Sequence, residues 1–215
     1  IVKDMVYGGA DFIKEDEIMA HNLYLPLEKR VEAVEHLKNI SGWKGFFAYC
    51  INADPMELLG NIKKIHYHTC TPNVIGGCHI NFWSGLGAYT TARGFDIATH
   101  YQRSGIRILT DPSNKYSVSW PVLVKLGCMA GVDSMHVGML GGYYPEGESE
   151  EETLEAISIC ESYNVIPSLS CGMNPVLARE IKERIGNNFM ASVGGWLHTG
   201  DSLIKKVKEM RESLD

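Results

Sequence analysis

The chain has 215 residues, of which 45% are hydrophobic and 21% charged, and its formal net charge is −6. This composition is typical of a globular domain with one sizeable core. Lysine and arginine are scattered along an acidic chain, and no apolar run is long enough to cross a membrane. No signal-peptide pattern opens the sequence. We therefore expect neither a nucleic-acid partner nor a membrane partner.

The cysteines predict a reduced, cytoplasmic protein. They show neither a CxxC pair nor the spacing of a zinc site, and several lie inside apolar runs such as AYC and SIC. Free thiols in a core are typical of the cytoplasm. A disulfide framework is the weaker alternative for a chain of this length. The cysteines are Cys50, Cys70, Cys78, Cys128, Cys160 and Cys171.

Short apolar runs of strand character alternate with helical patterns along the chain. The opening IVKDMVYGG (1–9) is typical of the end of a helix and its glycine cap. Asn174 followed by Pro175 predicts a capped helix start. Strands are expected at 10–14, 45–52, 74–82, 95–101, 134–138, 165–170 and 189–195. Helices are expected at 27–40, 55–65, 120–131, 149–163, 175–186 and 202–214.

This alternation predicts βαβ units and a parallel sheet, hence an α/β fold. Seven strands in this order fit a TIM (β/α)₈ barrel better than an open sheet, and the strand they lack is the first. A seven-stranded sheet would leave an unpaired edge, which soluble proteins avoid. We therefore predict that residues 1–215 form a single barrel domain, truncated so that its first strand is missing.

Every expected strand ends in polar residues. Buried parallel strands normally end in apolar or turn residues, and the chemistry of a barrel lies at these strand ends. One histidine at such a place is more often a satisfied core residue than a ligand, but polar groups after seven strands indicate a site. They are Lys14, Asp16, Glu17, Asn52, His79, Asn81, His100, Arg103, His136, Ser170, Gly172, Gly194 and Gly195.

The first of these strand ends, in GGADFIKEDE (8–17), combines an amine with two acids. The neighbouring carboxylates of Asp16 and Glu17 suit Mg²⁺, which prefers oxygen ligands. The Lys14 ammonium would repel that ion, unless CO₂ converts a desolvated, neutral amine into an anionic carbamate. A plain ion pair between Lys14 and the acids is the competing interpretation, and on spacing alone it is the more frequent one.

Glycine turns after the last two strands suit a phosphate group. SCG (170–172) and VGG (193–195) precede helices, where backbone N–H groups can approach an anion. Loops after the last two strands are a common phosphate site in barrels. Arg103 and His136 can hold a second anionic group. Tight-turn geometry and, for Arg103, a salt bridge at the rim are the competing interpretations. With the metal cluster, these groups indicate a sugar monophosphate or bisphosphate.

GGADFIKEDE closely resembles the GG-x-DF-x-K-x-DE segment of the RuBisCO large chain. In that family the lysine is carbamylated, and the aspartate and glutamate complete the Mg²⁺ site. The resemblance therefore implies Lys14 as carbamate and Asp16 and Glu17 as metal ligands. It runs in order over nearly the whole chain, and this segment is its most specific motif.

Four further segments carry the resemblance. HYQRSG is similar to the family's HxHRA segment, and AGVDSMHVGMLGG is similar to the segment that carries a phosphate-binding histidine and the mobile loop after strand 6. SCG resembles the family's SGG, and VGG resembles its FGGG. The substrate contacts that these segments imply are Arg103, His136, Ser170, Gly172, Gly194 and Gly195.

The chain departs from the family pattern at several positions. Gln102 stands for the second histidine of the HxHRA segment, and Ile106 stands for the third of the family's trio. Cys171 and Trp196 replace glycines of SGG and FGGG. Tyr143 stands where the loop after strand 6 brings a lysine that steadies the added CO₂. The loss of this cation removes electrostatic help for a carboxylated intermediate.

The pattern therefore resembles the RuBisCO-like (form IV) proteins, which keep enolisation or isomerisation and drop carbon fixation. Enolisation needs a cation that polarises a carbonyl and a base for the α-proton, for which the Lys14 carbamate is the candidate. We interpret the chain as the barrel portion of an enzyme that carries out Mg²⁺-dependent enolisation or isomerisation of a phosphorylated keto-sugar.

Three alternatives stay open. The first is a ribulose-1,5-bisphosphate carboxylase of divergent archaeal type, and the second is a non-catalytic binding or assembly subunit that keeps the fold. The third is an unrelated barrel aldolase with a Schiff-base lysine.

The resemblance also implies a partner. Family members have a separate N-terminal α/β domain and work as dimers in which that domain closes the partner's site. We expect a homodimer or higher oligomer, or a second chain that supplies the missing N-terminal part. We expect this chain alone to be inactive.

Overall fold

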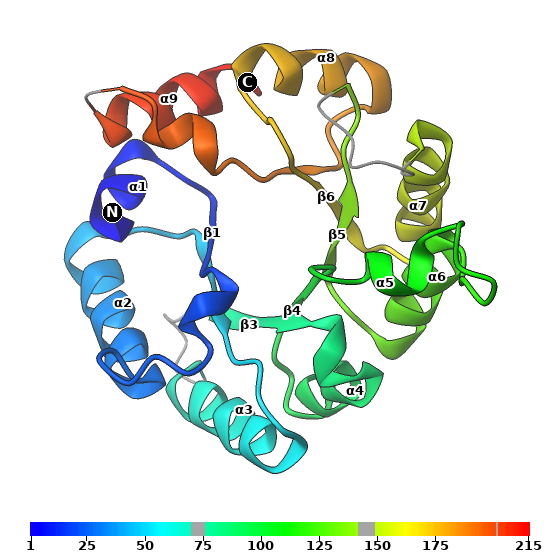
Figure 1. Ribbon diagram of the computed structural model, residues 1–215. Helices are drawn as coiled ribbons and strands as arrows, with labels where there is room; N and C mark the ends of the chain where they lie inside the picture. The colour runs from blue at the N-terminus through cyan, green and yellow to red at the C-terminus, as the bar shows by residue number, and fades with distance from the viewer. Residues whose placement is uncertain (70–75, 142–148, 201) are drawn as a thin grey trace.

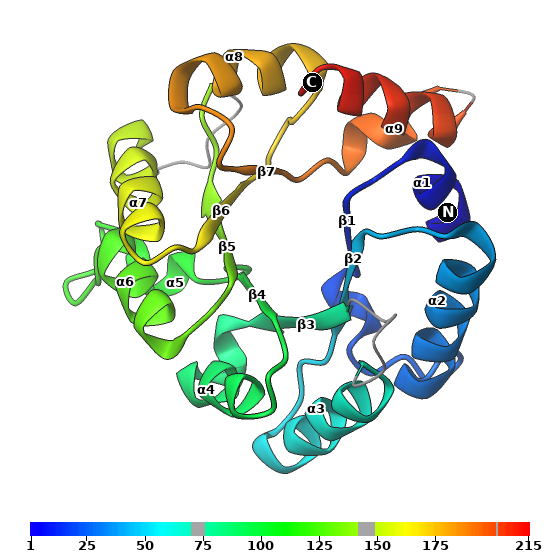
Figure 2. The same cartoon turned by 180° about the vertical axis from the view of Figure 1, so that it is seen from behind.

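The computed structural model of the protein describes residues 1–69, 76–141, 149–200 and 202–215. The described strands form one seven-stranded parallel sheet, in which each strand pairs with the next along the chain. The sheet curves into an incomplete barrel surrounded by helices (Figure 1 and Figure 2). The prediction of an α/β fold, a TIM-type barrel short of one strand, is confirmed. The strands are β1 (Phe12–Lys14), β2 (Phe46–Cys50), β3 (Gly76–Asn81), β4 (Thr99–Gln102), β5 (Ser134–Gly138), β6 (Ile166–Leu169) and β7 (Met190–Ala191).

The predicted helices lie close to their expected positions. The described α-helices are α1 (Val2–Gly8), α2 (Leu27–Ser41), α3 (Pro55–Thr69), α4 (Leu86–Gly94), α5 (Arg107–Thr110), α6 (Trp120–Ala130), α7 (Glu150–Ser162), α8 (Pro175–Ile185) and α9 (Leu203–Glu212). Short 3₁₀ turns are η1 (Glu17–Met19), η2 (Phe82–Ser84) and η3 (Gly195–His198). The sequence pattern predicts neither α4 nor α5. The strand expected at 74–82 begins at residues 74 and 75, which lie outside the described residues.

Local capping explains two of the helix boundaries. The chain leaves α1 through Gly9 at φ 87°, a left-handed conformation that glycine adopts without strain. At the start of α8, the side-chain oxygen of Asn174 accepts hydrogen bonds from the N–H groups of Val176 and Leu177 at 3.0 and 3.1 Å. Both caps confirm what the sequence predicts at these positions.

The two faces of the sheet differ in chemistry. The outward face packs under helices: Tyr101 of β4 stacks on Tyr89 of α4 with ring centroids 5.2 Å apart. The inward face lines the barrel interior. There the ring centroid of Phe12 on β1 lies 5.5 Å from the ring centroids of both Phe46 on β2 and His100 on β4. His79 of β3 lies 5.8 Å from His100. The interior is therefore part aromatic and part polar.

Helices close the ring where the sheet is open. Among the described strands, β1 pairs only with β2 and β7 pairs only with β6. Helix α1 packs against α9 across this gap. A Cβ on Gly8 would come within 2.6 Å of Val207, and Arg211 Nη1 donates to Asp11 Oδ1 at 2.8 Å. Close helix packing thus joins the first and last segments of the chain.

The cysteines agree with the predicted core role. Cys50, Cys78, Cys128 and Cys160 are buried free thiols, and Cys171 is a half-buried one. Cys70 lies outside the described residues. No helix in the described part of the chain is long and apolar enough to span a bilayer.

Gly77 on β3 provides a test of the barrel packing. A Cβ there would lie 2.1 Å from the Ala98 carbonyl oxygen and 2.6 Å from Phe46. Because the nearer atom is backbone, Gly77→Ala should lower the free energy of unfolding by about 1–3 kcal/mol in urea titrations. Gly60→Ala in α3 is the control, because no described atom outside the helix's own backbone lies within 4 Å of the new Cβ, and it should raise the free energy of unfolding by up to about 1 kcal/mol. Equal effects would contradict this packing.

Candidate active site

Lys14 is the last residue of β1 and is half-buried. Burial lowers the pKa of its amine, and the carboxylates of Glu17 and Asp16 act in the opposite direction. Among the described residues, no carboxylate oxygen lies within 4.0 Å of the Lys14 nitrogen. The simple ion pair, the competing interpretation of this segment, is therefore not formed.

The two acids occupy the start of η1, directly after β1. Asp16 is exposed, and its Oδ1 accepts a hydrogen bond from the N–H of Ile18 at 3.0 Å. Glu17 accepts a hydrogen bond from the Ser104 hydroxyl. Burial raises the pKa of Glu17, but this hydrogen bond, a backbone hydrogen bond and the nearby Lys14 outweigh burial and hold the pKa below its usual range. The contact with Ser104 links the end of β1 to the end of β4.

These residues fit a metal site only if Lys14 contributes a ligand. In the described part of the chain, no three histidine, cysteine or acidic side chains converge on a point that could hold a metal ion. Two carboxylates at one strand end are an incomplete oxygen shell for Mg²⁺. The desolvated Lys14 amine lies beside them and has no ion-pair partner among the described residues. A carbamate there would supply the oxygen ligand that the two acids lack.

Three buried imidazoles, His79 of β3, His100 of β4 and His136 of β5, line the barrel interior. His79 Nδ1 lies 2.7 Å from the Glu15 carbonyl oxygen, and His100 Nδ1 lies 2.9 Å from the Ser134 hydroxyl. Burial lowers the pKa of His79 to about 4 and that of His136 to about 3, and it holds the pKa of His100 well below its usual value. All three rings are neutral at pH 7. Within the described residues, each leaves one ring nitrogen without a hydrogen-bond partner.

Two of the predicted phosphate residues are in direct contact. His136 lies on β5, and its Nε2 is hydrogen bonded to the hydroxyl of Ser170, which follows β6. The Ser170 N–H donates to the Gly138 carbonyl at 3.0 Å and holds the two strand ends together. A neutral His136 can contact a phosphate through an N–H group but brings no positive charge.

Arg103 follows β4 and is held against β5. Its Nη1 donates to the Val137 carbonyl at 3.1 Å, and its guanidinium lies 4.7 Å from the centre of the Trp120 ring. Cation–π stacking fixes the orientation of a guanidinium. Arg103 is therefore the cationic group next to the His136–Ser170 pair.

The two glycine turns differ in what they offer an anion. Cys171 and Gly172 both adopt positive φ, 76° and 88°, and Asn174 already binds two N–H groups of the following helix. After β7, Gly194 and Gly195 are exposed, and among the described residues no atom beyond their chain neighbours lies within 4 Å of where a Cβ would lie. Among the described residues, no side chain caps η3. The second turn is therefore the more open of the two for a phosphate.

The side chain of Asn52, after β2, binds the end of β3 at Asn81. The Asn52 side-chain oxygen accepts from the Asn81 N–H at 2.6 Å and from the Ser84 hydroxyl at 3.3 Å. These contacts join two strand ends, so both residues have local structural partners.

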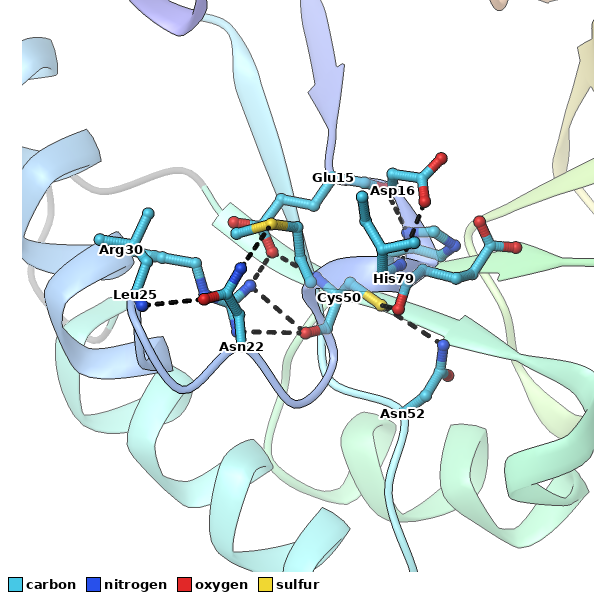
Figure 3. A network of polar contacts seen from close by, with 11 residues as sticks. Glu15, Asp16, Asn22, Leu25, Arg30, Cys50, Asn52 and His79 are labelled. Atoms are coloured by element: carbon cyan, nitrogen blue, oxygen red, sulfur yellow. Dashed lines mark hydrogen bonds and ion pairs between the residues drawn. The ribbon is translucent and has the colours of Figure 1, made fainter.

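Sequence reasoning missed residues that lie next to the site. Glu15 forms a buried ion pair with Arg30 of α2 (Figure 3), and Ser104 binds Glu17. Helical spacing contains a signal for Arg30, which lies on the same face as Leu27 and Val34, among the buried positions of α2. Nothing in the sequence identifies its partner. Tyr143, the expected replacement of the loop lysine, lies in 142–148, outside the described residues.

Parallel strands with polar groups at their carboxyl ends define this chain as an incomplete (β/α) barrel. The family description "Ribulose bisphosphate carboxylase large chain, catalytic domain" matches residues 1–201. The chain belongs to this family.

Curated relatives support this assignment. Ribulose bisphosphate carboxylase of Archaeoglobus fulgidus is 26% identical over 99% of this chain and 53% of its own length. The protein of the same name from Rhodopseudomonas palustris is 31% identical over 78% of this chain and 38% of its own length. The chain thus spans about half the length of the curated relatives it matches.

Solved structures show the same fold. A rubisco-like protein from Burkholderia fungorum matches with a TM-score of 0.82 at 23% identity, over 99% of this chain and 55% of that chain. A rubisco-like protein (MtnW) from Alicyclobacillus acidocaldarius has a TM-score of 0.85 at 18% identity, with the same coverage. The dimeric archaeal Rubisco from Hyperthermus butylicus has a TM-score of 0.80 at 23% identity, over 100% of this chain and 54% of that chain.

The buried histidines should make the fold sensitive to acid. Their folded-state pKa values lie below the value of about 6.5 expected in the unfolded chain. The contribution of these histidines to stability is therefore full above pH 6.5 and is lost as pH falls toward about 4. Each histidine then lowers the free energy of unfolding by about 1.4 kcal/mol per pH unit. Burial raises the pKa of Glu15 to about 7, so this residue acts in the opposite direction. Between pH 7 and 4.5 it offsets the loss of stability caused by one histidine.

We expect His100→Asn to reduce the change in the free energy of unfolding with pH by about 1.4 kcal/mol per pH unit, because it removes the contribution of one histidine. The measurement is the free energy of urea unfolding between pH 7.5 and 5.0. The control is His36→Asn at an exposed position of α2, which should keep the wild-type slope. An unchanged slope in the His100 variant would show that this imidazole does not stay neutral in the fold.

Proposed function

We propose that the intact protein carries out Mg²⁺-dependent enolisation or isomerisation of a phosphorylated keto-sugar. The observation that carries the proposal is the end of β1, where a desolvated Lys14 amine lies beside two carboxylates without an ion-pair partner among the described residues. Membership of the RuBisCO large-chain family supports this chemistry. The specific substrate is the part of the proposal that the family relation leaves open.

The proposed roles follow from the chemistry of each residue. Carbamylated Lys14, Asp16 and Glu17 would hold the ion, and bound Mg²⁺ would polarise the carbonyl next to the carbon that loses its proton. A carbamate oxygen on Lys14 is the candidate base for that proton. Ser104 keeps Glu17 ionised and oriented by its hydrogen bond.

The substrate phosphate would be held by the groups at the ends of β4 to β7. Arg103 supplies positive charge, and the His136–Ser170 pair supplies neutral donors. The open backbone at Gly194 and Gly195 can approach a phosphate closely. Gly172 is the remaining proposed contact, next to Cys171 in a turn with positive φ.

We further propose that the intact protein assembles with itself or with a chain that covers the strand ends. Large apolar side chains are exposed on the segments after β1, β2 and β3, including Leu23, Tyr24, Met56 and Trp83. Exposed apolar side chains on these segments are available for contact with a partner. Solved relatives include a dimeric Rubisco and an octameric Rubisco from Pyrococcus horikoshii.

The central test is metal-dependent ligand binding by the complete protein. Calorimetry should show binding of a sugar bisphosphate that requires both Mg²⁺ and bicarbonate. Lys14→Met and Asp16→Asn should weaken it more than about 100-fold, because each removes a ligand of the ion. Lys44→Met, at an exposed position before β2, is the control. Binding that ignores Mg²⁺ and bicarbonate would favour the non-catalytic subunit instead.

The carboxylase of divergent archaeal type is the second candidate, supported by the similarity to the Archaeoglobus enzyme. We expect the complete protein to form no 3-phosphoglycerate from ribulose-1,5-bisphosphate and labelled CO₂, since Tyr143 replaces the cation expected in the loop after strand 6. CO₂-dependent formation of 3-phosphoglycerate would establish the carboxylase. An unrelated barrel aldolase is contradicted by the family match.

A further inference from the structure

Glu15 lies between Lys14 and Asp16, but its side chain points to the other side of β1 (Figure 3). There it forms an ion pair with Arg30 of α2, in which the side chains are 9% and 4% exposed. The same carboxylate oxygen of Glu15 accepts a hydrogen bond from the Cys50 N–H at 2.8 Å. The ion pair therefore ties the segment after β1 to both β2 and α2.

Cys50 at the end of β2 is the common anchor of this segment. Its carbonyl oxygen accepts from Arg30 Nη1 and Nη2 at 3.5 and 3.4 Å. Its thiol lies 3.8 Å from the Glu17 carbonyl oxygen and 3.3 Å from the Asn52 amide nitrogen. Cys50 thus contacts the segment at two positions, Glu15 and Glu17, and contacts Arg30 as well.

The backbone of Glu15 is fixed at both of its polar groups. Its N–H donates to the Ala48 carbonyl at 3.0 Å and extends the pairing of β1 with β2. Its carbonyl oxygen lies 2.7 Å from His79 Nδ1. A carbonyl can only accept, so the Nδ1 atom of His79 carries the proton. Strands β2 and β3 and helix α2 all hold this one residue.

A buried ion pair is a costly way to stabilise a fold, because two apolar residues of similar volume are often equally stable or more so. A metal site, in contrast, needs its ligands held within about half an ångström. Lys14 and Asp16 are the direct neighbours of Glu15. We call the contacts of Glu15 with Arg30, Cys50 and His79 the clamp. The clamp therefore acts on the backbone that presents the amine and the carboxylates.

We propose that Glu15, Arg30 and His79 are positioning residues that set the backbone of residues 14–17, so that Lys14, Asp16 and Glu17 can share one cation. This inference rests on the proposed function. The side chains of the three positioning residues do not bind the cation.

The test separates positioning from stability. In the complete protein with bicarbonate, Arg30→Met should weaken Mn²⁺ binding, measured by electron paramagnetic resonance, by about ten- to a hundredfold. The double variant Glu15→Met/Arg30→Met removes the buried charges together and should recover or exceed the wild-type unfolding midpoint. Its Mn²⁺ affinity should remain low. Wild-type affinity in the double variant overturns the proposal.

Two matched controls accompany these variants. Lys64→Met breaks an exposed ion pair of 2.7 Å between Lys64 of α3 and Glu28 of α2, the helix that also carries Arg30. This variant should leave Mn²⁺ affinity unchanged. His79→Asn keeps an N–H donor near the position of Nδ1 and should retain affinity, whereas His79→Leu should lose about tenfold. Equal losses in both His79 variants would remove His79 from the positioning set.

A second readout does not depend on the metal. Amide hydrogen exchange of residues 14–17 in metal-free protein should become faster in the Arg30 and double variants, because the clamp on Glu15 is lost. If wild-type protein binds no Mn²⁺ with bicarbonate, the proposed function fails, while faster exchange still supports the clamp. Unchanged exchange in both variants overturns the clamp itself.

Discussion

Desolvation of the Lys14 amine is the constraint on which the candidate site depends. The amine must lose its charge at modest cost, which requires that it be removed from water without a close carboxylate. Burial lowers its pKa, and Glu17 and Asp16 act against burial from beyond ion-pair distance in the described structure. A direct ion pair would favour the ammonium and block the reaction with CO₂. The end of β1 therefore has the arrangement that the proposed carbamylation requires, a desolvated amine with two carboxylates near it.

Strand alternation is what separates the two kinds of acid. Lys14 ends β1 in register with Ala48, so Glu15 turns to the opposite side and meets Arg30. A shift of one residue would turn Glu15 to the interior and Lys14 to the helix side, and would leave Arg30 buried without its carboxylate. Glu15 thus pairs with a cation of the fold, while Asp16 and Glu17 stay near Lys14. Three consecutive acids have two distinct roles because of the register of one short strand.

The sequence predicts what is local and misses what is distant. The capped start of α8 follows from Asn174 and Pro175, and the strands follow from apolar runs between turn residues. Helix α4 has glycines and threonines that weaken its pattern, and its packing through Tyr89 is a tertiary contact. The Glu15–Arg30 pair spans a β–α connection, so spacing alone could not find it. For the same reason, spacing favoured an ion pair at Lys14 that the described structure lacks.

Charge balance explains how one interior can serve two states of the proposed site. With a protonated Lys14, the amine and the two acids carry one net negative charge. With a carbamate and Mg²⁺, the same cluster again carries one net negative charge, because the ion's two positive charges offset the change at Lys14. The neutral His79, His100 and His136 around the interior need no change of protonation between the states. Because the net charge of the cluster is the same in both states, the exchange adds no uncompensated charge to the interior.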